Sequence, residues 1–241
     1  MAVAVITGAS SGIGAEYIKA VAELYPDIDE LWLIARREDK LKEQASKYPE
    51  KKCVILPLDL GKIESLQALR IKLEEKNPNI KVLINDAGCG GKVMFKNQEL
   101  EDMMGIVELN CRGLIGVTKV CLPFIHDEGT IVQVSSTSAF VPNTNLIVYC
   151  ATKSFVKTFS LGLRQELKER KINVCTVYPG LVMTDIVKDI TGAQRLVPKV
   201  SARDCAINHC VLQRKGAVVI QQELFINAIV FFAKYCHRNL W

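Results

Sequence analysis

The chain has 241 residues and a mass of 26.8 kDa, and 49% of its residues are hydrophobic and 24% are charged. This composition is ordinary for a globular protein and excludes intrinsically disordered, collagen-like and low-complexity classes. The 31 Lys and Arg residues exceed the 26 Asp and Glu residues by only five, and they are spread along the chain without a block that would indicate nucleic-acid binding.

The sequence shows no signal peptide, because the apolar run Val3–Ile6 is interrupted at Gly8. No apolar run reaches the roughly 18–20 residues that cross a bilayer. The sequence has nine cysteines and no CxxC pair. This pattern indicates that the cysteines are small buried side chains in a reducing compartment rather than parts of a redox or metal site. We therefore expect a cytoplasmic protein with no membrane span and no bound metal.

Short apolar runs alternate along the chain with segments whose apolar residues recur at helical spacing, such as Ile13, Tyr17, Val21 and Leu24. The expected strands are Val3–Ile6, Leu31–Ala35, Val54–Pro57, Lys81–Ile84, Thr130–Ser135, Asn173–Tyr178 and Ala217–Ile220. Apolar strands separated by helices are typical of a parallel sheet that is covered on both faces. The pattern predicts an α/β fold, a doubly wound parallel sheet of about seven strands, as a single domain over residues 1–241.

The first expected strand ends in a glycine-rich turn, Thr7-Gly8-Ala9-Ser10-Ser11-Gly12-Ile13-Gly14, and a helix follows it. Glycines permit a sharp turn and a close approach to a pyrophosphate, and the helix N-terminus attracts the anion. The absence of Gly-Lys-Ser/Thr excludes a Walker A loop. A dinucleotide site is predicted at Gly8, Ser10, Ser11, Gly12, Ile13 and Gly14, and a tight turn without a ligand is the alternative.

The second expected strand ends in Ala35-Arg36-Arg37. An acidic residue at this place would hold the ribose 2′-hydroxyl of NAD, and none is present. Two guanidinium groups instead favour a 2′-phosphate, which they bind through charge-assisted hydrogen bonds. The sequence therefore predicts NADP(H) in preference to NAD(H), with Arg36 and Arg37 as ligands. The alternative is that both arginines are solvated and have Glu38 as a local partner.

Tyr149 and Lys153 are four residues apart in an expected helix, so they share one face. An ammonium group near a phenol stabilises the phenolate, which lets a tyrosine exchange a proton with an alcohol oxygen. Ser136 ends an apolar strand before this helix, and its hydroxyl can fix a carbonyl oxygen. These residues form the predicted catalytic group, with Ser136 preferred to Ser135 because of its spacing from Tyr149.

Taken together, the motifs resemble the short-chain dehydrogenase/reductase family over nearly the whole chain. The likeness also includes Asp59-Leu60, Asn85-Asp86-Ala87-Gly88, Asn110 and Pro179-Gly180 with Thr184, all in the family's order. The resemblance implies a Rossmann-like fold and an NADP(H)-dependent oxidoreductase that interconverts a secondary alcohol and a ketone.

The resemblance implies roles for individual residues. Tyr149 would be the general acid/base, Ser136 would hold the substrate oxygen, and Lys153 would bind the nicotinamide ribose. Asn110 would organise a water chain for proton relay. Cofactor contacts are expected at Asp59, Leu60, Asn85, Ala87, Gly88, Pro179, Gly180 and Thr184. The family usually has Asn where this chain has Asp86, which cannot donate as an amide does, and we expect a small structural effect.

The family's segment equivalent to residues 181–200 covers the substrate, and here its first part is largely apolar. It indicates a steroid-like or acyl or alkyl ketone substrate, although a short helix that packs on the core is the alternative. The resemblance also implies a homodimer or homotetramer. Two rival functions are a non-catalytic NADP-sensing regulator and an epimerase or dehydratase of the same fold.

Overall fold

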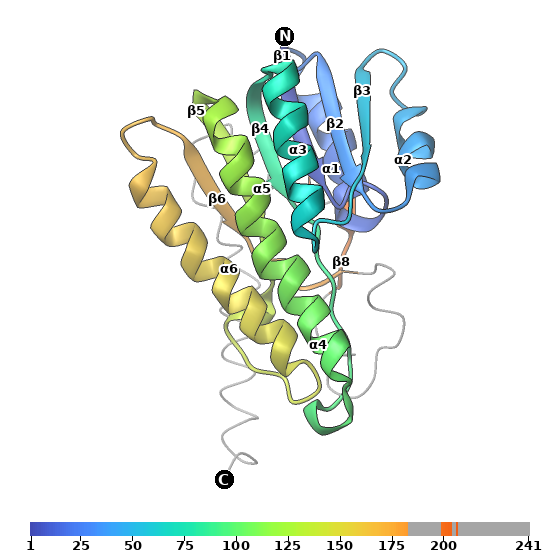
Figure 1. Ribbon diagram of the computed structural model, residues 1–241. Coiled ribbons are helices and arrows are strands. Elements are labelled where there is room, and N and C mark those ends of the chain that lie inside the picture. Colours follow the sequence, from blue (N-terminus) through green and yellow to red (C-terminus); the bar gives the residue numbers. More distant parts are fainter. Residues whose placement is uncertain (183–198, 204–205, 207–241) are drawn as a thin grey trace.

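The computed structural model describes residues 1–182, 199–203 and 206. Its centre is a six-stranded parallel sheet with the strand order β3-β2-β1-β4-β5-β6 (Figure 1). The strands are β1 (Ala2–Thr7), β2 (Glu30–Ala35), β3 (Lys52–Pro57), β4 (Asn79–Asn85), β5 (Ile125–Val134) and β6 (Asn173–Val177). The predicted parallel, Rossmann-like arrangement is therefore confirmed.

Helices connect the strands and lie on both faces of the sheet (Figure 1). They are α1 (Gly12–Leu24), α2 (Glu38–Ala45), α3 (Ile63–Lys76), α4 (Leu100–Val107), α5 (Leu114–Cys121) and α6 (Ile147–Glu166). A π-helical turn, η2 (Glu108–Gly113), joins α4 to α5, so the three form one long helical segment. Short 3-10 turns lie at Phe95–Asn97, Leu122–Phe124 and Thr137–Ala139.

Successive side chains of a strand point to opposite faces of the sheet, so the apolar core is divided into two layers. From β1, Ala4 and Ile6 pack with the buried residues of α1 and α2, whereas Val3 and Val5 pack with those of α3 and α5. Every residue of β1 is buried. A strand that is buried on both faces needs apolar side chains throughout, which explains its uninterrupted hydrophobic run.

The order of the strands reverses next to β1, because the chain builds outwards to β2 and β3 and then returns to place β4 on the other side of β1. The carboxyl ends of β1 and β4 are therefore neighbours, and the connections after them lead to opposite faces. Ligands of open α/β sheets bind in the crevice that such a reversal creates.

The structure differs from the sequence prediction in the count and length of strands. The sheet has six strands among the described residues, and the expected seventh strand, Ala217–Ile220, lies outside them. Strand β5 begins at Ile125, five residues before its predicted start, because it pairs with β4 across an irregular register near Ile80. Strands β7 (Leu181–Val182) and β8 (Lys199–Val200) form a separate pair that the sequence did not indicate.

Most of the predicted substrate-covering segment, 183–198, and with it Thr184, falls outside the described residues. The single-domain organisation over residues 1–241 stays a prediction. In the part of the chain that the structure describes, no helix combines the length and the apolar character that a membrane crossing requires.

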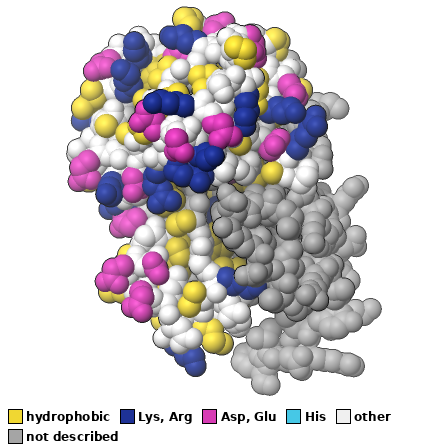
Figure 2. All heavy atoms as spheres, turned by 90° about the vertical axis from the view of Figure 1, so that its right-hand side faces the viewer, with side chains coloured by type: hydrophobic (Ala, Val, Ile, Leu, Met, Phe, Trp, Pro, Cys, Tyr) yellow, Lys and Arg dark blue, Asp and Glu magenta, His cyan; other side chains and the backbone are white. Residues whose placement is uncertain are grey.

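The face shown in Figure 2 carries basic and acidic side chains that are interspersed over its upper half. Helix α2 contributes paired charges, because Lys42 lies 2.7 Å from Glu38 and Lys40 lies 2.8 Å from Glu43. Exposed pairs of this kind contribute only about 0.3–0.5 kcal/mol each. This face is therefore a solvated surface of mixed charge.

Candidate active site

A cavity of about 570 Å³ lies at the carboxyl ends of β1 and β4, where the strand order reverses. It extends from the turn after β1 and the end of β2 to the first turns of α6. Its wall includes Gly8, Ser10, Ser11, Gly12, Ile13, Arg36, Arg37, Asp59, Leu60, Ala87, Gly88, Ser136, Tyr149, Lys153, Pro179 and Gly180. The structure thus brings together most of the residues that the sequence analysis selected.

The turn after β1 adopts a backbone conformation that side chains disfavour. Gly8 has φ = 72° and Gly12 has φ = 60°, both in the left-handed region. Gly14 is required for a different reason, because a Cβ atom there would collide with the carbonyl group of Gly8. Gly14 lies off the cavity wall, and it allows the first turn of α1 to pack against the end of β1.

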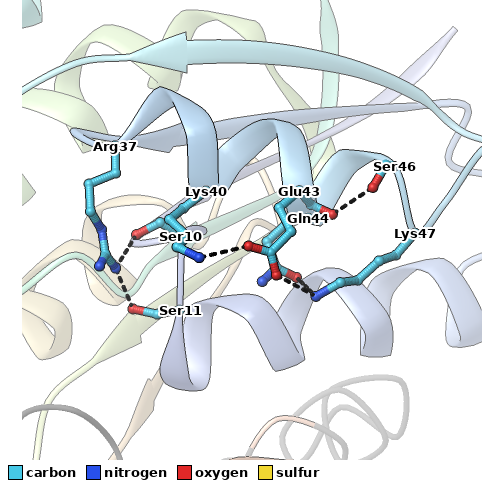
Figure 3. Close-up of polar contacts among 8 residues, drawn as sticks. All are labelled: Ser10, Ser11, Arg37, Lys40, Glu43, Gln44, Ser46 and Lys47. Atoms are coloured by element: carbon cyan, nitrogen blue, oxygen red, sulfur yellow. Dashed lines mark hydrogen bonds and ion pairs between the residues drawn. The ribbon is translucent and has the colours of Figure 1, made fainter.

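Two serines of this turn contact an arginine from the end of β2. The guanidinium Nη2 of Arg37 donates hydrogen bonds to Ser10 Oγ at 3.2 Å and to Ser11 Oγ at 3.1 Å (Figure 3). Glu38, the alternative partner for the arginines, forms its ion pair with Lys42 instead. Arg37 is exposed and the two serines are half-buried at the rim of the cavity, where an anion from solvent can reach them.

Lys153 and Tyr149 occupy successive turns of α6 and both line the cavity. The Lys153 side chain is buried, with 6% of the residue exposed, and its Nζ donates to the Val134 carbonyl at 2.9 Å. The same Nζ lies 5.6 Å from the centroid of the Tyr149 ring. The carbonyl at the end of β5 therefore holds the ammonium group beside the phenol.

Ser135 and Ser136 follow β5 and differ in how their hydroxyls are bonded. Ser135 Oγ donates to the Lys153 carbonyl at 2.8 Å, so its proton is already used within the fold. Ser136 Oγ accepts a bond from the Ser138 backbone N–H at 3.1 Å, and it donates to no acceptor among the described residues. The Ser136 hydroxyl is the one with a proton available for a ligand in the cavity.

Asn110 is buried in the π-helical turn η2 and joins three elements. Its Oδ1 accepts from the Cys89 N–H at 2.9 Å, and its Nδ2 donates to the Cys89 carbonyl at 2.8 Å. Nδ2 also donates to Thr152 Oγ1 at 3.0 Å, and that hydroxyl donates to the Tyr149 carbonyl at 2.8 Å. Asn110 therefore ties the loop after β4 to the helix that carries Tyr149, without lining the cavity itself.

Asp86, the position at which the chain departs from the family motif, lies against the glycine-rich turn. Its Oδ2 is 2.8 Å and 2.9 Å from the points that Cβ atoms on Gly8 and Gly14 would occupy, and its carboxyl accepts a bond from the Gly14 N–H. Burial raises the pKa of Asp86 to about 7, against the opposing effects of Lys153 and of the Gly14 hydrogen bond. The Asp86 carboxyl also forms part of the cavity wall.

Asn85 lies off the cavity wall in a buried polar network between β4, β5 and α5. Its Nδ2 donates to Thr118 Oγ1 at 2.9 Å and to Gln133 Oε1 at 3.1 Å. The contact of Asn85 with a cofactor therefore stays a prediction. The cofactor contacts expected at the other positions also stay predictions, as does the role of Asn110 in a proton relay.

Several residues on the wall were not selected from the sequence, namely Ala35, Leu58, Asp86, Cys89, Gly90, Leu109, Val134 and Ser135. Most of these follow a strand or precede a selected residue, so their position in the chain was the available signal. The sequence signal for Gly90 was stronger, because three glycines, Gly88, Gly90 and Gly91, lie within four residues. Such a run indicates a backbone that must approach another group closely.

The Cys89 thiol faces the same region but is held in its neutral form. Burial raises its pKa, although Arg36 and Lys153 act in the opposite direction. Burial likewise raises the pKa of Cys121 to about 12. A thiol is reactive as the thiolate, and the raised pKa values favour the neutral thiol at both positions. The packing role expected of the cysteines stays a prediction.

The sequence is similar to several oxidoreductases. It is 34% identical over 188 residues to the uncharacterized oxidoreductase DltE of Bacillus subtilis (strain 168), covering 75% of this chain and 71% of that protein. It is 33% identical over 187 residues to an NADP-dependent 3-hydroxy acid dehydrogenase of Schizosaccharomyces pombe (strain 972 / ATCC 24843), again over 75% and 71% of the two chains.

Solved structures show the same fold. A short-chain dehydrogenase from Sphingobium yanoikuyae in complex with NADPH has a TM-score of 0.80 and 26% identity, over 100% of this chain and 97% of that one. A 3-ketoacyl-(acyl-carrier-protein) reductase from Brucella melitensis complexed with NADH has a TM-score of 0.76 and 26% identity, over 87% and 89%. The family model for short chain dehydrogenases matches residues 2–195. The chain therefore belongs to the short-chain dehydrogenase family of oxidoreductases.

Proposed function

We propose that the protein is an NADP(H)-dependent oxidoreductase that interconverts a secondary alcohol and a ketone. The observation that carries this proposal is that Ser136, Tyr149 and Lys153 line the same cavity as the glycine-rich turn after β1 and the arginines after β2. A proton-transfer group and a site for a dinucleotide phosphate thus share one crevice, as hydride transfer to a carbonyl requires.

The described residues fit NADP(H). The turn at Gly8–Gly12 leaves the first backbone N–H groups of α1 open to a diphosphate, and Arg36 and Arg37 supply positive charge for a 2′-phosphate. Asp59 and Leu60 would flank the adenine, and Pro179 and Gly180 would contact the nicotinamide end. When bound, the nicotinamide donates or accepts the hydride that the reaction transfers.

Protein side chains would carry the accompanying proton transfer. In the reduction, the Ser136 hydroxyl donates a hydrogen bond to the ketone oxygen, and Tyr149 transfers its phenolic proton to that oxygen as the alcohol forms. In the oxidation, the tyrosinate takes the proton back. The buried Lys153 ammonium lies near enough to the Tyr149 ring to stabilise the negative charge in either direction.

The preference for NADP(H) over NAD(H) rests on charge. Arg37 reaches Ser10 and Ser11 at the rim of the cavity, and neither serine carries a charge that would neutralise it. The Schizosaccharomyces pombe relative is named as NADP-dependent, whereas the two solved structures described above hold NADPH in one case and NADH in the other. The two arginines support the phosphorylated cofactor.

The substrate class follows the sequence analysis: a ketone or alcohol of apolar character, such as a steroid-like or acyl or alkyl compound. A homodimeric or homotetrameric assembly and a cytoplasmic location also stay predictions from the sequence.

The test is NADPH consumption with a panel of apolar ketones, comparing the wild type with Tyr149→Phe. Loss of the phenolic proton is expected to lower kcat by about 10²- to 10⁴-fold, the usual range for a general acid. Tyr48→Phe is the control, because Tyr48 packs on the core beside α1 and α2 and lies off the cavity wall. Unchanged turnover in Tyr149→Phe would overturn the proposed mechanism.

A further inference from the structure

The loop that follows Gly88 passes unusually close to the Tyr149 ring. A Cβ atom on Gly90 would lie 2.9 Å from Cδ2, 3.3 Å from Cγ and 3.4 Å from Cε2 of that ring. Carbon atoms pack at about 3.5–4.0 Å, so the space beside the ring admits a glycine and no larger residue. Among the described glycines, Gly90 is the one whose missing side chain leaves room for the phenol.

The backbone conformation does not require glycine at this position. Positive φ angles among the described glycines occur at Gly8 and Gly12, and Gly90 is not one of them. An L-residue can adopt the Gly90 backbone, and only the Tyr149 ring stands in its way. The need for glycine here therefore concerns packing against one side chain rather than the path of the chain.

The loop is anchored at the residue before Gly90. Cys89, Gly90 and Gly91 also line a second cavity of about 540 Å³, so hydrogen bonds rather than packing must hold the loop in place. The peptide groups of Cys89 are held on both sides by the Asn110 amide, through its bonds at 2.9 Å and 2.8 Å. Asn110 is in turn bonded to Thr152, which donates to the Tyr149 carbonyl. The loop and the backbone of Tyr149 are thus anchored to one buried amide.

Since the backbone is anchored at Cys89, next to Gly90, and at Tyr149, an added Cβ atom on Gly90 would displace the part that rotates most readily, which is the Tyr149 side chain. Rotation of the ring away from Gly90 moves the phenol oxygen relative to Lys153 Nζ and to Ser136, both of which are fixed by bonds to backbone groups. Reacting groups tolerate little misplacement, and a shift of about 1 Å can lower a rate by about 10²-fold.

We propose that Gly90 is a positioning residue, which sets the orientation of the Tyr149 phenol by packing its backbone against the ring. The inference rests on the proposed function, because it acts through the tyrosine to which that proposal assigns the proton transfer. It adds a residue outside the catalytic motif to the determinants of the rate.

The test compares Gly90→Ala with Gly91→Ala in the full-length protein. Gly91 is the matched control because it lies in the same loop, and its Cβ would meet only side-chain ends, the Gln98 amide nitrogen at 3.2 Å and Ile106 Cδ1 at 3.9 Å. Both substitutions remove the same chain entropy from the unfolded state. We measure kcat with a ketone and NADPH, the Kd for NADPH by fluorescence, and the pH–rate profile.

Gly90→Ala is expected to lower kcat by about 10- to 100-fold, with the Kd for NADPH changed less than about threefold. The alkaline limb of its pH–rate profile is expected to move, because the phenol is displaced relative to the Lys153 ammonium. Gly91→Ala is expected to match the wild type in all three measurements. Equal kcat values and pH profiles in the two variants would overturn the inference, as would parallel losses of kcat and NADPH affinity in Gly90→Ala.

A measurement on the wild type keeps the inference open to refutation if Gly90→Ala does not fold. With labelled glycine and tyrosine, a nuclear Overhauser contact between the Gly90 Hα and Tyr149 Hδ protons is expected, and its absence would refute the packing. Inactive Tyr149→Phe beside fully active Gly90→Ala would refute the role of Gly90 alone. Full activity in Tyr149→Phe would instead refute the proposed function.

Discussion

At the Tyr149 end of the cavity Lys153 and Ser136 are buried and bonded to backbone atoms, whereas at the Arg37 end the polar groups are partly or fully exposed and bonded to one another. Lys153 is 6% exposed and donates to a main-chain carbonyl, and Ser136 is 7% exposed and accepts a bond from a main-chain N–H. The Arg37 guanidinium instead contacts two serine hydroxyls at 3.1–3.2 Å in solvent. The first arrangement fixes positions, and the second supplies charge that a ligand can engage.

This difference explains why substitutions at the two ends should act on different quantities. Groups that are held by the fold align the reacting atoms, so their loss reduces the rate of the chemical step. Groups that are held only by each other rearrange around a bound anion, so their loss reduces affinity. The predictions below test this division.

The largest effect is expected at the two serines after β5. Ser136→Ala removes the hydroxyl that can donate a hydrogen bond to the substrate oxygen. It is expected to lower kcat by about 10²-fold, which is the usual effect of removing one hydrogen-bond donor to a developing oxyanion in an enzyme. Ser135→Ala removes a buried bond to the Lys153 carbonyl and is expected to cost about 1 kcal/mol of stability, with a smaller loss of kcat. Steady-state kinetics and thermal denaturation measure both, and a larger kcat loss in Ser135→Ala would reverse the assignment.

A smaller effect, on affinity, is expected at the exposed end. Arg37→Ala removes a charge-assisted contact worth about 1.5–3 kcal/mol, which corresponds to a rise in the Kd for NADPH of about 10- to 100-fold. The Kd for NADH, which lacks the 2′-phosphate, should change little. Lys47→Ala is the control, because Lys47 is exposed after the end of α2 and bonds to Gln44 (Figure 3). Equal losses for NADPH and NADH would contradict the division.

The third effect concerns stability and Asp86, which lies between the two ends. Its pKa is raised to about 7 in the folded protein, so the folded form resists ionisation while the unfolded chain ionises near pH 4. The unfolded state therefore binds fewer protons between these values, and the contribution of Asp86 to stability falls as the pH rises from about 4 to about 7. The full pKa difference corresponds to at most about 4 kcal/mol, and to less where solvent reaches the carboxyl.

Asp86→Asn removes this titration. The melting temperature of the variant should exceed that of the wild type by more at pH 8 than at pH 5, as measured by thermal denaturation in buffers of matched ionic strength. Asp102→Asn, at an exposed site on α4, is the control and should show no such trend. A difference between Asp86→Asn and the wild type that is independent of pH would contradict the burial of the carboxyl.

The arrangement of strands and most of the cavity wall could be predicted because they depend on local pattern and residue type. The buried strand β1 requires an apolar run, and Gly8 and Gly12 occupy a conformation that suits glycine. Arg37 could be selected from its chemistry, because a guanidinium group at the end of the second strand suits a 2′-phosphate better than it suits a free ribose hydroxyl.

The contacts that orient the tyrosine could not be predicted, because they depend on how distant segments approach each other. Nothing in the sequence around Asn110 indicates that its amide holds Cys89 on one side and Thr152 on the other. The closeness of Gly90 to the Tyr149 ring depends on the same long-range packing. A spacing pattern identifies Tyr149 and Lys153 as partners but carries no information about the loop that packs on the phenol.

The π-helical turn η2 has a consequence for which changes of chain length the protein tolerates. A π turn holds one more residue than an α turn, so it acts as an insertion within the continuous rod formed by α4, η2 and α5. Deletion of one residue from 108–113 would return this turn to ordinary α winding and leave α4 and α5 in the same rotational phase, so Ile106 would keep its buried position. Deletion of one residue from within α4 or α5, which hold no extra residue, would instead rotate the two parts of the rod by about 100° relative to each other. The rod therefore tolerates the loss of one residue at the π turn more readily than elsewhere.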